Sequence, residues 1–213
     1  MALLASLLFL TVVARGAVVV DRIAVIVGKH VIKLSDIEHD LRLTQFLNGE
    51  PLNLSGDAKR KQAERAIDQQ LIRTELDSGG YSRATDSQAE ALLHQIIQER
   101  YGGSESKMRA ALRRYGVTEE ELRAQLVWQL TVLDFIQQRF RPEVAVSDDQ
   151  VRAYYDQHIA EFRREHPDDS SYETLEPEVR DALEGEPVTK EFENWLGQQR
   201  QQTKIQFRQG AFQ

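Results

Sequence analysis

The sequence contains no cysteine, so the fold cannot rely on disulfide bonds and the protein has no thiolate nucleophile or thiolate metal ligand. It also lacks a Gly-x-x-x-x-Gly-Lys phosphate loop and a serine nucleophile in an elbow motif, so the usual sequence signals of ATP-driven work and serine-based hydrolysis are missing. Positive charge is outnumbered, because 27 Lys and Arg against 34 Asp and Glu give a formal net charge of −7. Such an acidic chain is poorly suited to bind nucleic acid or an anionic membrane surface.

An apolar run that suggests a targeting segment occurs at the N-terminus. Residues 1–14 are mostly apolar, but a bilayer span needs about 20 apolar residues. Small residues, Ala14 and Gly16, precede the expected cleavage point. We therefore predict that residues 1–16 are a signal peptide and that the mature chain begins at Ala17. Because no Lys or Arg comes before Arg15, an uncleaved anchor or an incorrectly assigned start remains an alternative.

Two short β-branched segments on either side of Gly28-Lys29 predict a β-hairpin. Residues 18–27 are largely apolar, and residues 30–32 continue the pattern after the turn. Glycine at the first central position favours a type II′ turn. Near the C-terminus, residues 204–207 alternate polar and apolar side chains and predict one more strand. Because short strands need partners, we expect the two ends of the chain to meet in one small sheet.

Between these strands the apolar residues follow a helical period, which predicts a mainly α fold. Four segments carry the capping-box pattern that marks helix N-termini; they begin at Ser35, Thr85, Thr118 and Ser147. Glycines suited to helix C-termini follow three of the apolar-periodic stretches; they are Gly79-Gly80, Gly102-Gly103 and Gly116. The longest predicted helix, residues 119–141, has apolar faces that include Leu133 and Phe135. We expect it to be the central helix of the domain.

The composition changes in the last third of the chain. A predicted helix over residues 148–162 is followed by the charged segment 163–171, which has the composition of a solvated linker. Further on, Gly185-Glu186-Pro187 should break or kink a helix, because proline lacks a backbone N–H and clashes with the preceding turn. We therefore divide the mature chain into an N-terminal domain, residues 17–162, the linker, and a C-terminal helix and strand, residues 172–213, that pack back on the domain.

Histidines and carboxylates could indicate a metal or catalytic site, but their positions favour a structural role. His158 with Glu161, and His94 with Gln98, each supply a single pair on one helix face. A metal site in a helical bundle needs more ligands than this. The carboxylates of residues 119–121 fall in a first helical turn, where they interact favourably with the helix dipole. We predict no metal, no cofactor and no catalytic residues.

Aromatic side chains are the remaining candidates for a binding site. Most of them fall on the periodic apolar faces and are expected in the core. A few could line a groove between helices, where aromatic side chains can hold extended polypeptide segments with little sequence demand. The peptide-binding candidates are Trp128, Phe135, Phe140, Tyr154, Tyr155, Phe192 and Trp195.

Several segments, taken in order, resemble those of SurA-type periplasmic chaperones. Residues 21–32, followed by Leu34-Ser35-Asp36-Ile37, resemble the family's opening hairpin and capped first helix. The segments that carry the resemblance further along the chain are residues 67–72, 115–120, 146–155, 192–196 and 205–207. No single motif is unique to the family, and the specificity lies in the order and spacing of the whole set.

The resemblance implies a periplasmic, ATP-independent chaperone that binds unfolded outer-membrane proteins and has a link to the outer-membrane assembly machinery. In the family, parvulin prolyl isomerase domains usually lie between the helix that residues 148–162 resemble and the closing segment that starts at Tyr172. Here only residues 163–171 lie between them, whereas a domain needs about 50 residues or more. The Gly-Gly-x-Leu-Gly turn of parvulins is also missing. We expect a chaperone core without the isomerase domain.

Two alternatives stay open from the sequence. The first is a prolyl isomerase, as the family resemblance would suggest. The second is a non-catalytic interaction subunit whose cleft holds one specific folded partner, such as a separate isomerase or a component of the assembly machinery. Neither alternative involves nucleic acid or a nucleotide.

Overall fold

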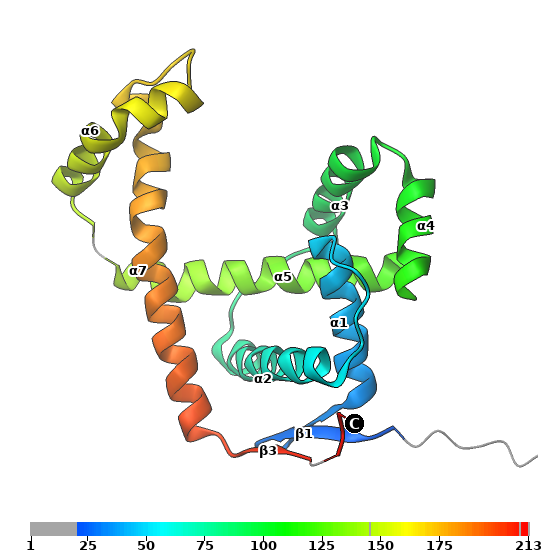
Figure 1. The fold of residues 1–213 in the computed structure, drawn as a ribbon. Helices are drawn as coiled ribbons and strands as arrows, with labels where there is room; N and C mark the ends of the chain where they lie inside the picture. The colour runs from blue at the N-terminus through cyan, green and yellow to red at the C-terminus, as the bar shows by residue number, and fades with distance from the viewer. Residues whose placement is uncertain (1–20, 145, 209, 213) are drawn as a thin grey trace, which may run out of the picture.

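The fold is known from a computed structural model that describes residues 21–144, 146–208 and 210–212. The predicted signal peptide and its cleavage point lie outside the described residues. Within the described ranges the chain forms seven α-helices, one short 3-10 helix and a three-stranded sheet (Figure 1). The predicted mainly α fold with a small sheet is therefore confirmed. None of the helices described is both long enough and apolar enough to cross a membrane.

The sheet joins the two ends of the described chain, as predicted. Strand β1 (Ile23–Val27) lies between β2 (His30–Lys33) and β3 (Ile205–Phe207), and both pairings are antiparallel. Gly28, in the β1–β2 turn, has a φ of 59°, and no non-glycine residue described has a positive φ, as expected for a type II′ turn. Backbone Gly28 N–H also donates to the Lys204 carbonyl at 2.9 Å. The turn therefore contributes to holding the last strand.

The helices begin and end largely where the capping signals lie. Their bounds are α1 Leu34–Asn48, α2 Gly56–Gly79, α3 Asp86–Tyr101, α4 Glu105–Tyr115, α5 Glu119–Phe140, η1 Arg141–Glu143, α6 Asp148–Glu165 and α7 Tyr172–Gln202. Thr85, Thr118 and Ser147 are N-caps with complete capping boxes, which confirms three of the four predicted starts. Three helices end before glycines with positive φ, as predicted; these are Gly80, Gly102 and Gly116.

The predicted cap at Ser35 is wrong. Strand β2 runs into α1 without a loop, so the helix begins at Leu34 and Lys33 occupies the N-cap position. The carboxylate of Asp36 accepts the Lys33 backbone N–H at 3.2 Å. Ser35 instead donates its hydroxyl to Asp21, just before β1. Its side chain therefore ties the start of α1 to the start of the hairpin.

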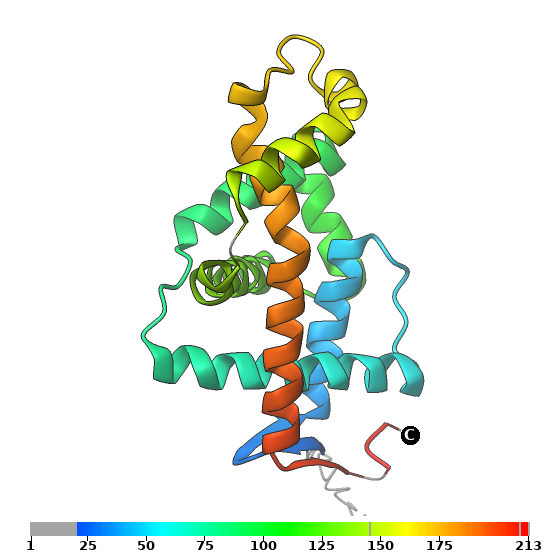
Figure 2. The ribbon, with the colours of Figure 1, turned by 90° about the vertical axis from the view of Figure 1, so that its left-hand side faces the viewer.

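Helix α5 crosses the middle of the molecule (Figure 1). The sheet and α2 lie on one side of it, and α1 runs from the sheet past α5, whereas α3, α4 and the tip formed by α6 and the start of α7 extend on the other side. Figure 2 shows α7 running along the length of the molecule, from this tip to the sheet. Separate apolar clusters fill the space between the sheet and α2, between α1, α3, α4 and α5, between α2, α5 and α7, and between α6 and α7.

Of the break or kink predicted at Gly185-Glu186-Pro187, the break does not occur, because α7 is one continuous helix across this segment. Packing holds the helix on both sides of the proline. Val179 is buried in the cluster with α6, and Val188 is buried in the cluster with α2 and α5. Helix α6 also extends to Glu165, so that the connection between α6 and α7 is residues 166–171, shorter than the predicted linker.

We predict that Phe207→Ala lowers the free energy of unfolding by about 1–3 kcal/mol. Phe207 is half-buried and packs on the apolar cluster under the sheet, so its loss should cost less than the roughly 3–5 kcal/mol of a fully buried phenylalanine. Gln206→Ala is the matched control, because successive side chains of a strand lie on opposite faces. Urea unfolding measures both variants. Equal effects of the two substitutions would contradict the packing of β3 on the core.

Candidate binding groove

Four of the seven aromatic candidates lie together in the core where α5 and α7 cross. The ring centroids of Phe135 and Phe140 are 5.7 Å apart, and Trp195 lies 5.5 Å from Phe135 and 5.8 Å from Phe140. Phe192 stacks on Trp195 at 6.0 Å. Phe135 has no exposed surface, and Phe140 and Trp195 are also buried. These rings hold α5 and α7 together where the two helices cross.

Two more candidates, Tyr154 and Tyr155, belong to the separate core between α6 and α7. Tyr155 is buried and stacks on Phe162, with centroids 5.8 Å apart. Tyr154 is half-buried and stacks on the ring of His158 at 4.1 Å, while Nδ1 of His158 lies 2.9 Å from the Tyr154 carbonyl. The structure therefore places these residues in a different apolar cluster from the one at the crossing of α5 and α7.

The seventh candidate, Trp128, lines an open groove of about 540 Å³ between α1, α2 and α5. The residues that line this groove are Thr44 and Asn48 of α1, Gln62, Arg65, Gln69 and Ile72 of α2, and Gln125, Trp128, Gln129, Val132 and Leu133 of α5. We call this the glutamine groove, because glutamines supply much of its polar lining. It combines apolar surface with amide groups that can both donate and accept hydrogen bonds.

The apolar part of the groove is contributed by α2 and α5. Ile72 is buried, Val132 is half-buried and Leu133 is 57% exposed. The prediction that Leu133 lies on a core face of the central helix is wrong. The helix passes from the cluster around α3 and α4 to the cluster around α7 along its length, so the face that is buried changes. Leu133 is left open to solvent inside the groove.

Gln62 gives the groove an unusual polar group. Its side chain is only 1% exposed, and its Oε1 has no hydrogen-bond partner. The other buried glutamine of this helix pair, Gln45, is satisfied: its Oε1 accepts the Asn53 backbone N–H at 2.8 Å, and its Nε2 donates to the Asn53 carbonyl at 3.0 Å. A buried acceptor without a donor costs about 1–3 kcal/mol. The unpaired Oε1 of Gln62 is therefore a cost to the stability of the fold.

Arg73 and Asp40 extend the groove's polar surroundings toward the sheet. The Arg73 guanidinium carbon lies 3.8 Å from the centroid of the Trp128 ring, so one face of that ring is covered. Asp40 and Arg73 both line a smaller cavity of about 230 Å³ beside β2. Burial raises the pKa of Asp40, against the opposing charges of His39 and Arg73. Asp40 therefore carries its negative charge at a cost in the folded protein.

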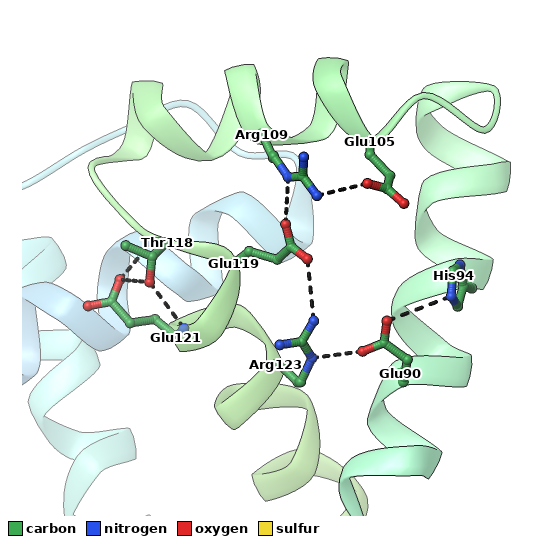
Figure 3. A network of polar contacts seen from close by, with 8 residues as sticks. All are labelled: Glu90, His94, Glu105, Arg109, Thr118, Glu119, Glu121 and Arg123. Carbon is green, nitrogen blue, oxygen red and sulfur yellow. Dashed lines mark hydrogen bonds and ion pairs between the residues drawn. The ribbon is translucent and has the colours of Figure 1, made fainter.

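A separate network of ion pairs fastens the ends of α3, α4 and α5 (Figure 3). Glu119 binds Arg109 at 2.8 Å and Arg123 at 3.3 Å, and Arg123 also binds Glu90 at 2.7 Å. Arg109 reaches Glu105 within its own helix at 2.8 Å. These side chains are partly exposed, and exposed pairs each contribute little. The network is best explained as a structural clamp between three helices, with the first-turn carboxylates in the position expected from the sequence.

One group of potential metal ligands occurs within the described ranges, at the tip between α6 and α7. Ligand atoms of Glu165, His166 and Glu178 lie within 4.8 Å of one another, and His166 Nε2 is 3.2 Å from Glu178 Oε1. All three side chains are partly or fully exposed, as is common for surface ion pairs. The histidines weighed from the sequence lie elsewhere: His94 pairs with Glu90 at 3.7 Å, and His158 contacts Tyr154.

The glutamines of the groove and Arg73 were not among the residues predicted from the sequence. Gln125 and Gln129 are four residues apart on α5, and Gln62 and Gln69 are seven apart on α2, so each pair shares one helix face. This spacing was available as a signal. It could not show that the two faces lie opposite each other, because that depends on how α2 packs beneath α5. Comparisons with protein-family models and with curated proteins find no match to this chain.

We predict that Asp40→Asn raises the free energy of unfolding at neutral pH. The raised pKa of Asp40 means that folding disfavours the ionised form. This cost is present above the folded pKa and disappears as the pH falls below the unfolded value of about 3.9. The stability difference between variant and wild type should therefore be largest near neutral pH and shrink toward about pH 4. Urea unfolding across this pH range measures it.

Glu186→Gln is the control for removing one negative charge, because Glu186 is exposed on α7. If Asp40→Asn lowered stability at neutral pH relative to this control, the attraction between Asp40 and Arg73 would outweigh the burial of the carboxylate.

Proposed function

We propose that the mature chain is a periplasmic, ATP-independent chaperone of the SurA type that binds unfolded outer-membrane proteins. The observation that carries the proposal is the open glutamine groove beside α5, with the exposed side chain of Leu133 and the unpaired acceptor of Gln62. The three-stranded sheet that joins the two ends of the described chain supports it, because the family resemblance includes the opening hairpin and the closing strand.

The groove suits a weak and reversible contact with an unfolded chain. Its apolar surface is modest, and its amide groups can bind a polypeptide backbone whatever the side chains are. Binding the unfolded state withdraws it from aggregation by mass action. Ordering a flexible client costs free energy, so only part of the contact energy appears as affinity. The client can therefore leave without nucleotide hydrolysis.

Prolyl isomerase activity is not part of the proposal. Residues 166–171 connect α6 directly to α7 at the place where the family usually carries its parvulin domains. This connection is far shorter than the roughly 50 residues that a domain needs.

We predict that the purified mature chain suppresses the aggregation of a urea-denatured outer-membrane β-barrel protein on dilution, measured by light scattering. Leu133→Glu should raise the concentration needed for half-maximal suppression by about fivefold or more. The reason is that a carboxylate replaces an apolar contact of roughly 1 kcal/mol in the groove. Leu52→Glu is the matched control, because Leu52 is 42% exposed and lies outside the groove lining.

Unchanged aggregation at a molar excess of the wild-type chain would refute the proposal. Equal effects of Leu133→Glu and Leu52→Glu would show that clients bind outside the groove. A single stoichiometric folded partner in a pull-down, with no protection of unfolded barrels, would favour an interaction subunit. Faster isomerisation of a proline-containing peptide in the presence of the chain would favour a prolyl isomerase.

A further inference from the structure

We propose that the tip between α6 and α7 binds one zinc ion, held by carboxylate oxygens of Glu165 and Glu178 and by a ring nitrogen of His166. One ligand atom from each of these residues lies within 4.8 Å of the other two. Glu165 is the last residue of α6, His166 is its C-cap, and Glu178 lies near the start of α7. The ion therefore joins the end of one helix to the next. None of these residues lines the glutamine groove.

Elsewhere in the described ranges, neighbouring carboxylates share an arginine. A guanidinium between two carboxylates supplies the positive charge and the N–H donors that hold both of them. Five arginines of the described chain each pair with two carboxylates in this way; they are Arg109, Arg123, Arg141, Arg180 and Arg200. Arginine is thus the usual means by which this protein brings two carboxylates together.

The pair Glu165 and Glu178 differs from these sites. Among the residues that the structure describes, neither carboxylate forms an ion pair with Lys or Arg, and the basic group beside them is His166, whose Nε2 lies 3.2 Å from Glu178 Oε1. Two carboxylates at close range repel each other unless a cation lies between them. A metal ion supplies that charge. Histidine can bind a metal ion through a free electron pair on its ring, whereas arginine has none to offer.

Buried neighbours position the three ligands. The backbone N–H of His166 donates to the Phe162 carbonyl at 2.8 Å, which fixes the C-terminal end of α6. Phe162 and Val179, the residue after Glu178, are both buried in the apolar cluster between α6 and α7. The two helices therefore meet at fixed points beside the ligands. Small rotations of exposed side chains are enough to bring the three ligand atoms to about 2 Å from one ion.

The ligand atoms select the class of metal. Ca²⁺ and Mg²⁺ bind through oxygen, so a histidine nitrogen is not expected in their sites. Ions that prefer thiolate find no such ligand, because the chain has no cysteine. One imidazole nitrogen and two carboxylate oxygens suit a divalent transition metal. Zn²⁺ accepts this set in tetrahedral geometry, with water as the fourth ligand.

The ion closes the connection between α6 and α7 into a loop. Residues 166–171 and the first turns of α7 then lie between two ligands of the same ion, His166 and Glu178. Helix ends and short connections open locally more easily than a core does, and a link between them limits that opening. Figure 2 shows this tip at the end of the molecule opposite the sheet. Zn²⁺ therefore stiffens the tip and leaves the sheet and the glutamine groove unchanged.

Isothermal titration calorimetry of the purified mature chain with ZnCl₂ tests the site. We expect one Zn²⁺ per chain, with no competition from a large excess of Mg²⁺. His166→Gln should weaken binding by about tenfold or more, and Glu165→Gln by about threefold or more, because each removes one of three ligands. His94→Gln is the matched control and should leave the affinity unchanged. His94 is an exposed histidine that pairs with one carboxylate, Glu90, at 3.7 Å, and so lacks a third ligand.

Hydrogen exchange measured by mass spectrometry locates the ion on the chain. Saturating Zn²⁺ should slow amide exchange in residues 163–178 of the wild type and of His94→Gln, and should not change it in His166→Gln. The ligands are partly or fully exposed, so the metal-free variants should unfold in urea at the wild-type midpoint. Loss of Zn²⁺ binding at an unchanged midpoint then reports on the ligands and not on the fold.

The inference is overturned if the wild-type chain shows no saturable binding up to about 1 mM Zn²⁺. It is also overturned if His94→Gln weakens binding as much as His166→Gln, or if Mg²⁺ displaces Zn²⁺. A stoichiometry of one ion per two chains would place the site between copies and would likewise contradict it, as would slowed exchange confined to segments other than the tip.

Discussion

The pairing of β3 with β1 is the constraint on which the rest of the structure depends. Hydrogen bonds from Gly28 N to the Lys204 carbonyl and from Arg208 N to the Ala24 carbonyl, each 2.9 Å, join residues at opposite ends of the described chain. A three-residue strand has little stability alone, so β3 stays in place through the apolar cluster beneath the sheet. Helix α7 must then run from the tip at α6 to this sheet. Its course across α5 and α2 is thereby fixed, and the aromatic cluster around Phe135 and Trp195 forms at the crossing.

The glutamine groove follows from the way α5 is shared between two cores. The first half of α5 packs with α1, α3 and α4 through Leu122 and Leu126, and the second half packs with α2 and α7 through Phe135 and Phe140. The buried stripe shifts around the helix between these halves. Trp128 lies in the second core beside the groove, with Arg73 on its ring. The face that carries Gln125, Gln129 and Leu133 is left uncovered above α2.

Local signals in the sequence predicted the elements well, because caps, turns and apolar periods act over a few residues. Three cap hydroxyls each accept the backbone N–H of the residue three positions later, as the capping-box pattern predicts; they belong to Thr85, Thr118 and Ser147. Errors arose where tertiary contacts decide. Helix α7 continues through Pro187 because apolar clusters on both sides of the proline hold it. Leu133 is exposed because the buried face of α5 changes between its two halves. The binding candidates were chosen as aromatic residues, yet five of the seven are buried, since large rings fill crossings between helices before they line grooves.

The coexistence of Gln62 and Leu133 in one groove carries more weight than either residue alone. A buried acceptor without a donor and a leucine left in water each work against a fold whose net stability is small. Neither is needed to hold α2 against α5, because buried apolar residues such as Ile72 and Phe135 already do so. A ligand relieves the second cost when it brings an apolar side chain over Leu133, as an unfolded polypeptide can. Because this apolar contact is small, the gain on binding stays modest. A site of this kind would hold an unfolded segment briefly and release it without an energy source.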